Sequence, residues 1–178
     1  MRLMTLQQGR ISGMPIKKQP QMFKVKSFDE LTAFECYDIF KLRQDTFICE
    51  HNHIFSDISE LDKGAHHVLY YEQERLAAYM RILFEDEGSL LLTRFVVHKA
   101  ERKTGLSHVF FSRVLNYLRD TYPKSPIHLY AHEKLSDFYR ERGFMKCEKK
   151  FFETDPREYF HFRFQISTPQ ETVDARIG

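Results

Sequence analysis

Hydrophobic and polar positions along the chain change period several times, and each change predicts a new element. Residues 23–26 alternate strictly, and the runs 65–72, 76–84 and 89–98 are short, apolar and bounded by charged turns, which is typical of strands. Between 29 and 47 the apolar residues instead recur at helical spacing and predict a long amphipathic helix. The first half is therefore a strand, a helix, a short helical turn at 57–61 and three strands in an antiparallel meander.

The second half continues with a crossover. A helix is predicted from Gly105 to about Tyr122, where prolines follow, and its apolar stripe is Val109, Phe110, Val114, Leu115 and Leu118. Residues 127–132 form a short strand that must return parallel to its neighbour. A short helix at 134–142 and two strands at 144–153 and 158–166 complete the order. The pattern predicts an α/β (α+β) fold with a mixed central sheet, an antiparallel meander followed by a β-α-β crossover, and helices on both faces.

Length and composition limit the classes of protein that the chain can belong to. Its 178 residues suit one domain, predicted at 22–167 between a flexible extension (1–21) and a polar tail (168–178). A net charge of +2 with interleaved signs does not indicate a dedicated nucleic-acid binder, and no apolar stretch approaches the ~20 residues of a membrane span. Three widely spaced cysteines favour reduced thiols and therefore a cytoplasmic protein. From the charge pattern and the lack of a long apolar stretch, we expect neither a nucleic-acid nor a membrane partner.

The stretch 93–118 carries the strongest chemical signal. A β-branched and aromatic run leads into a basic loop containing Arg102, Lys103 and Gly105, and then into a helix. The unpaired N–H groups of a helix start attract anions, and glycine lets a phosphate approach the backbone closely. The loop alone does not decide the matter, because one glycine at such a joint is common in α/β proteins.

Histidines and acids in the first half supply metal-ligand types without a closed ligand set. The polar segment 50–63 contains two histidines and several carboxylates in a loose arrangement, so no metal is predicted. His66 and His67 are adjacent on a strand and must point to opposite faces, so both cannot line one site.

The order of elements, the loop at 102–107 and the stretch 138–144 together resemble the GNAT superfamily of acetyl-CoA-dependent N-acetyltransferases. The stretch 138–144 is similar to that family's Y-x-x-x-G-F signature. Matches in 37–50, 62–67, 78–81, 93–97 and 129–132 make the chain most similar to the ElaA-like branch, over about residues 31–153. Two positions depart from the family pattern: Ser107 replaces a small glycine or alanine, and the turn before His161 lacks the usual glycine-containing run.

The resemblance implies how acetyl-CoA is bound. Backbone groups of one strand pair with the pantetheine arm, loop amides and basic side chains hold the pyrophosphate, and Tyr139 is the general acid that protonates the leaving thiolate. His132 matches a position that contacts the cofactor in many relatives, and a strand-end histidine without a role is the equal alternative. The cofactor-binding residues implied are Phe95, Val96, Val97, Arg102, Lys103, Thr104, Gly105, Leu106, Ser107, His132 and Tyr139.

The acceptor side stays open at this stage. The strand before the loop has no carboxylate where many relatives carry a glutamate, which leaves His67 or His66, Glu50 or a water relay as the general base. Arg43, Glu50 and Arg81 are candidates for binding an acceptor. For the two arginines, structural ion pairs with Asp62 or Glu50 fit the sequence equally well.

Three functional hypotheses follow. The first is transfer of acetyl from acetyl-CoA to a primary amine of a small molecule or peptide. The alternatives are a longer-chain acyltransferase related to homoserine-lactone synthases, and an acyl-CoA-binding or interaction module without catalysis. A homodimer is compatible with each of them.

Overall fold

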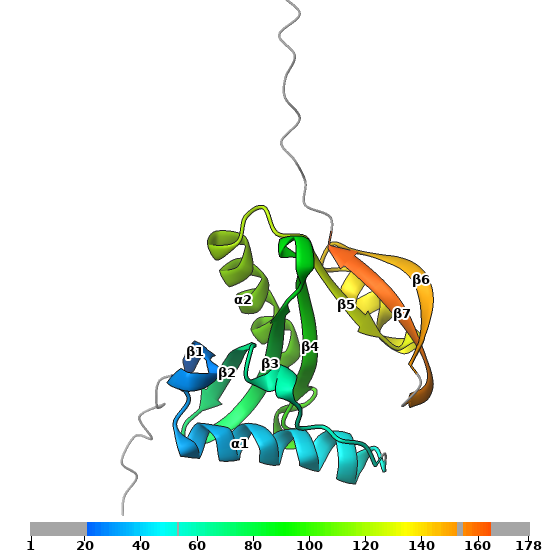
Figure 1. Cartoon of the computed structure of the whole chain (residues 1–178). Coiled ribbons are helices and arrows are strands. Elements are labelled where there is room, and N and C mark those ends of the chain that lie inside the picture. Colours follow the sequence, from blue (N-terminus) through cyan, green and yellow to red (C-terminus); the bar gives the residue numbers. More distant parts are fainter. Residues whose placement is uncertain (1–20, 53, 153–154, 165–178) are drawn as a thin grey trace, which may run out of the picture.

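The computed structural model describes residues 21–52, 54–152 and 155–164. The predicted extension, apart from Gln21, and the predicted tail lie outside these residues. The described chain forms one mixed sheet in the order β1-β2-β3-β4-β5-β7-β6 (Figure 1). Its strands are β1 (Met22–Ser27), β2 (His66–Glu72), β3 (Arg75–Phe84), β4 (Leu90–Val97), β5 (Ile127–Ala131), β6 (Phe144–Phe152) and β7 (Asp155–Phe164).

Strand directions confirm the predicted topology. β1 to β4 pair antiparallel, β4 and β5 pair parallel, and β5, β7 and β6 again pair antiparallel. The helix α2 (Leu106–Thr121) supplies the crossover between the two parallel strands. The direction of pairing therefore changes at β4–β5, the kind of position where α/β sheets collect ligands.

Helices cover both faces of the meander, which explains its nearly continuous apolar sequence. Alternate residues of β2 belong to different cores: Val68 and Tyr70 pack with α2, whereas Leu69 and Tyr71 pack with α1 (Ala33–Arg43). Figure 1 shows α1 and α2 on opposite sides of β2–β4.

The helix predicted over 29–47 is divided in the structure. A 3-10 turn (Phe28–Glu30) precedes α1, and a π-helical turn (Gln44–Glu50) follows it. The cause is capping chemistry: Thr32 Oγ1 accepts from the Glu35 N–H at 3.2 Å, while Glu35 Oε2 accepts from the Thr32 N–H at 3.0 Å. This reciprocal pair starts α1 later than the apolar spacing alone predicts.

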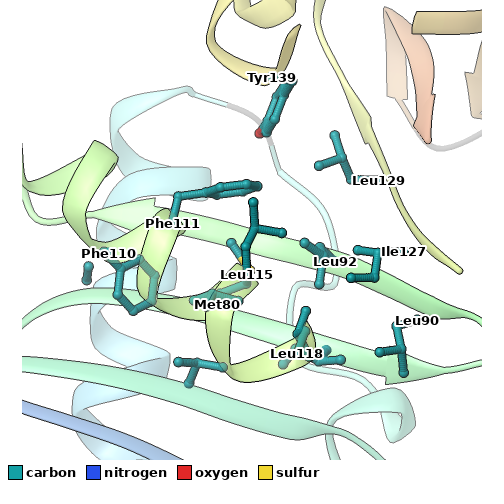
Figure 2. Close-up of a cluster of buried hydrophobic side chains, with 14 of the residues drawn as sticks. Met80, Leu90, Leu92, Phe110, Phe111, Leu115, Leu118, Ile127, Leu129 and Tyr139 are labelled. Atoms are coloured by element: carbon teal, nitrogen blue, oxygen red, sulfur yellow. The ribbon is translucent and has the colours of Figure 1, made fainter. Parts of the chain in front are cut away.

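The interior between α2 and the sheet is aromatic. Phe110 and Phe111 are fully buried and project from α2, as Figure 2 shows. The stripe predicted for this helix contained Val109, which is 48% exposed, and Leu106 and Phe111 are buried instead. Phe111 packs edge-on against Tyr139 of α3 (Ser136–Arg140), at 5.6 Å between ring centroids.

Candidate active site

A cleft opens where β5 turns away from β4. Parallel pairing joins Leu90–Leu92 to Ile127–Leu129 and stops there, although β4 continues to Val97. Residues from both strands line a cleft of about 1330 Å³. Its walls also include Phe111 of α2 and Tyr139 of α3.

A β-bulge shapes the β4 wall. Between Tyr79 and Arg81 of β3, the facing strand β4 contains one extra residue. Arg94 adopts a left-handed φ of 55° at this point. A bulge interrupts the alternation of side chains. The consecutive residues Thr93, Arg94 and Phe95 at this bulge all line the cleft.

The predicted pantetheine strand has unpaired backbone on the side of the cleft. The side chain of Phe95 lines the cleft, Val96 is buried in the α1 core, and Val97 is half-buried. Within the described chain, β4 beyond Leu92 pairs with β3 on one edge and with no strand on the other. Its outward N–H and C=O groups are therefore available to an extended ligand.

The predicted pyrophosphate loop presents backbone donors at the start of α2. Lys103 and Gly105 both take left-handed φ values, 65° and 87°, which bend the loop just before the helix. Within residues 21–52, 54–152 and 155–164, the N–H groups of Lys103, Thr104, Gly105 and Ser107 have no backbone acceptor, and Leu106 N–H has only a 3.4 Å contact with Thr104 Oγ1. Such a concave set of amides at a helix N-terminus fits a phosphate group.

Arg102 was predicted to bind the cofactor and Glu50 to bind the acceptor, but the two side chains form an ion pair with each other. The Arg102 guanidinium donates to both carboxylate oxygens of Glu50, and its Nε donates to the Val97 carbonyl at 3.1 Å. The hydrogen bond from Arg102 lowers the pKa of Glu50. Glu50 thus sits where it competes with an incoming anion for Arg102.

Tyr139 lies in the cleft wall with its ring packed among aromatic side chains. It is 5% exposed and contacts Phe111, Phe144 and Phe162. Its oxygen points away from α3 toward the centre of the cluster, as Figure 2 shows. Burial raises the pKa of the phenol, so Tyr139 keeps its proton at any physiological pH.

His132 follows β5 directly, and residues of β7 in the β6–β7 hairpin hold its side chain. Its Nδ1 lies 2.9 Å from the backbone oxygen of Glu158, and its ring stacks on Tyr159 at 4.4 Å. Because a carbonyl oxygen only accepts, Nδ1 carries the proton and Nε2 is left as a proton acceptor. All three residues line the cleft.

The two strand histidines point to opposite faces, as their spacing requires, and neither is among the residues that line the cleft. His67 is fully buried, with Nδ1 2.9 Å from the Tyr79 hydroxyl and Nε2 2.9 Å from the Asp62 carbonyl. Burial lowers the pKa of His67. His66 packs edge-on against Phe84. Their geometry is that of packed sheet histidines, away from the diverging strands.

Arg43 and Arg81 belong to one buried ion-pair network. Arg43 has no exposed surface and binds Asp57 at 2.8 Å and Asp62 at 2.7 Å. Arg81 Nη1 also binds Asp62, at 2.8 Å, and Arg94 Nε binds Asp57 at 2.6 Å. Arg43 is buried and does not line the cleft, so it cannot contact an acceptor directly in this structure. Arg81 and Arg94 both line the cleft.

Electrostatics within the network is dominated by Asp62. Burial opposes its ionisation, but hydrogen bonds from Arg43 and from the Ser59 N–H prevail and lower its pKa to about 2. Sequence reasoning offered Asp62 as one possible ion-pair partner of the two arginines, and the structure confirms that alternative for Arg43 and Arg81. Asp57 was noted only as a loose metal-ligand type. No local signal shows that arginines from α1, β3 and β4 converge on Asp57 and Asp62.

Comparison with known proteins places this geometry in a family. Residues 45–157 match the model described as the acetyltransferase (GNAT) domain. A UPF0039 protein of Schizosaccharomyces pombe is 30% identical over 133 residues, which cover 74% of this chain and 89% of that protein. The chain belongs to the GNAT acetyltransferase domain family.

Its relatives also confirm the predicted branch. Protein ElaA of Escherichia coli is 28% identical over 128 residues, covering 70% of this chain and 84% of ElaA. The crystal structure of E. coli ElaA matches with a TM-score of 0.74 at 24% identity, over 82% of this chain and 100% of that one. An acyl-CoA N-acyltransferase structure from Pseudomonas aeruginosa matches with a TM-score of 0.74 at 26% identity, over 81% and 99%.

The helices of the described residues give no candidate for a membrane span, because none combines sufficient length with sufficient apolar character.

Proposed function

We propose that the protein transfers an acetyl group from acetyl-CoA to a primary amine of a small molecule or peptide. The observation that carries the proposal is the continuity of the donor site. Among the residues that the structure describes, the strand edge beyond Leu92 has no partner strand and leads directly into a loop whose amides at 103–107 have no backbone acceptor. Acetyl-CoA needs both the free strand edge and the loop amides, because its pantetheine arm joins a thioester to a diphosphate.

The chain's residues divide the binding of acetyl-CoA between them. The free edge of β4 pairs with the amide groups of the pantetheine arm, as an added strand would. The loop amides and Arg102 hold the pyrophosphate, and Gly105 leaves the approach open, since a Cβ there would meet no atom within 4 Å. Acetyl-CoA supplies the acetyl group as an activated thioester.

Transfer requires two proton movements. The amine nitrogen attacks the thioester carbonyl carbon, the C–S bond breaks, and Tyr139 donates its phenolic proton to the departing thiolate sulfur. A β4 N–H polarises the carbonyl oxygen. His132 Nε2 takes the proton that the amine loses, because its Nδ1 proton is committed to the Glu158 carbonyl. Arg81 and Arg94 add positive charge at the cleft wall, which favours an acceptor that carries an anionic group.

The experiment combines binding with turnover. Acetyl-CoA should raise the melting temperature, and an amine panel should release free thiol. Tyr139→Phe should lower kcat by about 100-fold or more, the usual contribution of a general acid, while the Kd for CoA changes less than about threefold. Tyr70→Phe is the matched control: Tyr70 is equally buried, and its hydroxyl has no hydrogen-bond partner in the described chain.

The outcomes separate the hypotheses. Absence of any stabilisation by CoA or acetyl-CoA refutes the donor site. Stabilisation without thiol release across the panel favours a binding module, and release only from longer acyl-CoA donors favours the longer-chain acyltransferase. Full activity of Tyr139→Phe removes Tyr139 as the acid.

A further inference from the structure

A second cluster of chemically active side chains lies on the sheet next to the cleft. The ligand atoms of Cys147, Glu148 and His161 all lie within 4.8 Å of one another. His161 is opposite Tyr130 in the β5–β7 ladder, and its ring stacks on Tyr130 at 4.9 Å. Tyr130 itself lines the cleft, so the cluster is on the same wall.

An irregularity in β6 brings two consecutive side chains to one place. From Lys146 to Lys149, β6 advances three residues while β7 moves two, from Phe162 to Phe160. Regular alternation would send side chains 147 and 148 to opposite faces. The extra residue breaks that alternation, so a thiol and a carboxylate meet the same imidazole.

A chain of hydrogen-bonding contacts runs through this cluster, and it is one hydrogen short when both imidazoles are neutral. Four groups lie in a row: Glu85 Oε2 is 2.7 Å from His128 Nε2, His128 Nδ1 is 3.0 Å from His161 Nε2, and His161 Nδ1 is 3.0 Å from Glu148 Oε1. Each contact needs one hydrogen. Ionised carboxylates have none, and a neutral imidazole has one, so two rings supply two hydrogens for three contacts.

The missing hydrogen can belong to any of the three contacts, and one assignment of tautomers leaves the contact beside the thiol without it. If His128 donates from Nε2 to Glu85 and His161 donates from Nε2 to His128, every tautomer is assigned. His161 Nδ1 then faces Glu148 with a lone pair against a carboxylate oxygen, beside the Cys147 thiol. Two acceptors in contact repel each other unless a cation lies between them.

We propose that Cys147, Glu148 and His161 bind a zinc-type divalent cation, with solvent as the fourth ligand. Sulfur, nitrogen and carboxylate oxygen are the ligands that Zn²⁺ takes, at about 2.0–2.3 Å, which places ligand atoms about 3.5 Å apart. Glu148 can adjust its position relative to the other two ligands, because its side chain is 64% exposed. The contact of His161 with His128, and of His128 with Glu85, is the outer support that metal-bound imidazoles have.

The proposed ion joins β6 to β7 and, through His128, to β5. It therefore braces the hairpin that carries His132's partner and stiffens the wall of the cleft. The sequence predicted no metal, since its three ligands are types that occur everywhere and their spacing fits no zinc motif.

The test uses the whole chain after treatment with a chelator. Zn²⁺ titration by calorimetry should give one site per chain, and Co²⁺ should give a sulfur-to-metal charge-transfer band. Cys147→Ser and Glu148→Gln should each weaken Zn²⁺ binding by at least 10-fold, and Cys147→Ser should abolish the cobalt band. Cys36→Ser is the matched control, because that cysteine is also free and half-buried but lies on α1.

Two results would overturn the proposal. One is wild-type protein that binds neither ion, with nitrogen NMR showing a doubly protonated imidazole at position 128 or 161, so that a proton fills the deficit. The other is Zn²⁺ binding that survives both Cys147→Ser and Glu148→Gln. Melting curves of the metal-free variants show whether either substitution impairs folding.

Discussion

Replacing Asp62 with asparagine tests how the cleft wall is supported. Asp62 Oδ1 accepts from Arg43 at 2.7 Å and from Arg81 at 2.8 Å, and Oδ2 accepts from the Ser59 N–H at 3.0 Å. Asparagine keeps the shape but removes the charge and turns an NH₂ group toward one set of donors. Arg43 keeps Asp57, whereas in the described part of the chain Arg81 keeps only the Thr93 hydroxyl at 3.1 Å.

The expected loss of stability is large. Removing one partner of a buried ion pair costs about 3–5 kcal/mol, because the remaining charge stays buried without compensation. The lowered pKa of Asp62, about 2 against an ordinary 3.8, corresponds to a preference of about 2 kcal/mol for the ionised over the protonated carboxyl. For a chain of this length, a loss of about 3–5 kcal/mol corresponds to a fall in melting temperature of roughly 6–20 °C.

Urea unfolding followed by circular dichroism measures this difference. The midpoint should fall while the slope with denaturant stays unchanged, since the folded state remains the same. Glu60→Gln is the control: it lies on the same turn, its side chain is 87% exposed, and it should change stability by less than about 0.5 kcal/mol. An Asp62→Asn variant within about 1 kcal/mol of the wild type refutes the argument.

Acid gives a second test with a defined sign. The carboxylate's pKa is depressed on folding, so its contribution is complete above the unfolded value of 3.8 and is lost as the pH falls through about 2. The stability difference between wild type and Asp62→Asn should therefore be constant above pH ~4 and shrink toward pH ~2. A difference that stays flat over that interval contradicts an ionised Asp62.

Three further predictions concern the cleft and its loop. Gly105→Ala should lower CoA affinity and destabilise the fold by about 1–2 kcal/mol, because φ is 87° although the space is open, whereas Gly64→Ala should have little effect in the same melting and binding assays. His132→Asn should change the Kd for CoA by less than about threefold but lower kcat by about 100-fold. Unchanged turnover would mean that His132 is not the base and only contacts the cofactor. Glu50→Gln should tighten CoA binding by about 1.5- to 5-fold, more so at low salt, because it frees Arg102, and unchanged affinity at both salt concentrations would rule out that competition.

Much of the architecture was readable from local patterns. Period two in the strands, period 3.6 in α2 and the prolines after it are short-range signals, and they predicted the meander, the crossover and the loop that follows β4. The late start of α1 and the shift from Val109 to Phe111 were missed. Both depend on capping and on which face meets the sheet, and the sheet assembles residues that are distant in sequence.

The candidate site divides in the same way. The loop at 102–107 and Tyr139 came from contiguous motifs, and the structure places the loop at the helix start and Tyr139 in the cleft wall. Contiguous motifs did not identify the ion-pair partners of Arg43, Arg81 and Arg102, because each arginine has several acids at plausible separations in sequence. Only folding selected Asp62 for both Arg43 and Arg81, added Asp57 for Arg43, and paired Arg102 with Glu50.

By itself, the sequence determined the order of elements, the family resemblance and the basic loop, because these depend on neighbours within about one turn or one strand. The tertiary structure decided where β5 leaves β4, which carboxylate meets which arginine, and that Cys147, Glu148 and His161 share one wall. These outcomes follow from a bulge in β4, an irregularity in β6 and the burial of charge, which arise only when strands pair and side chains leave water.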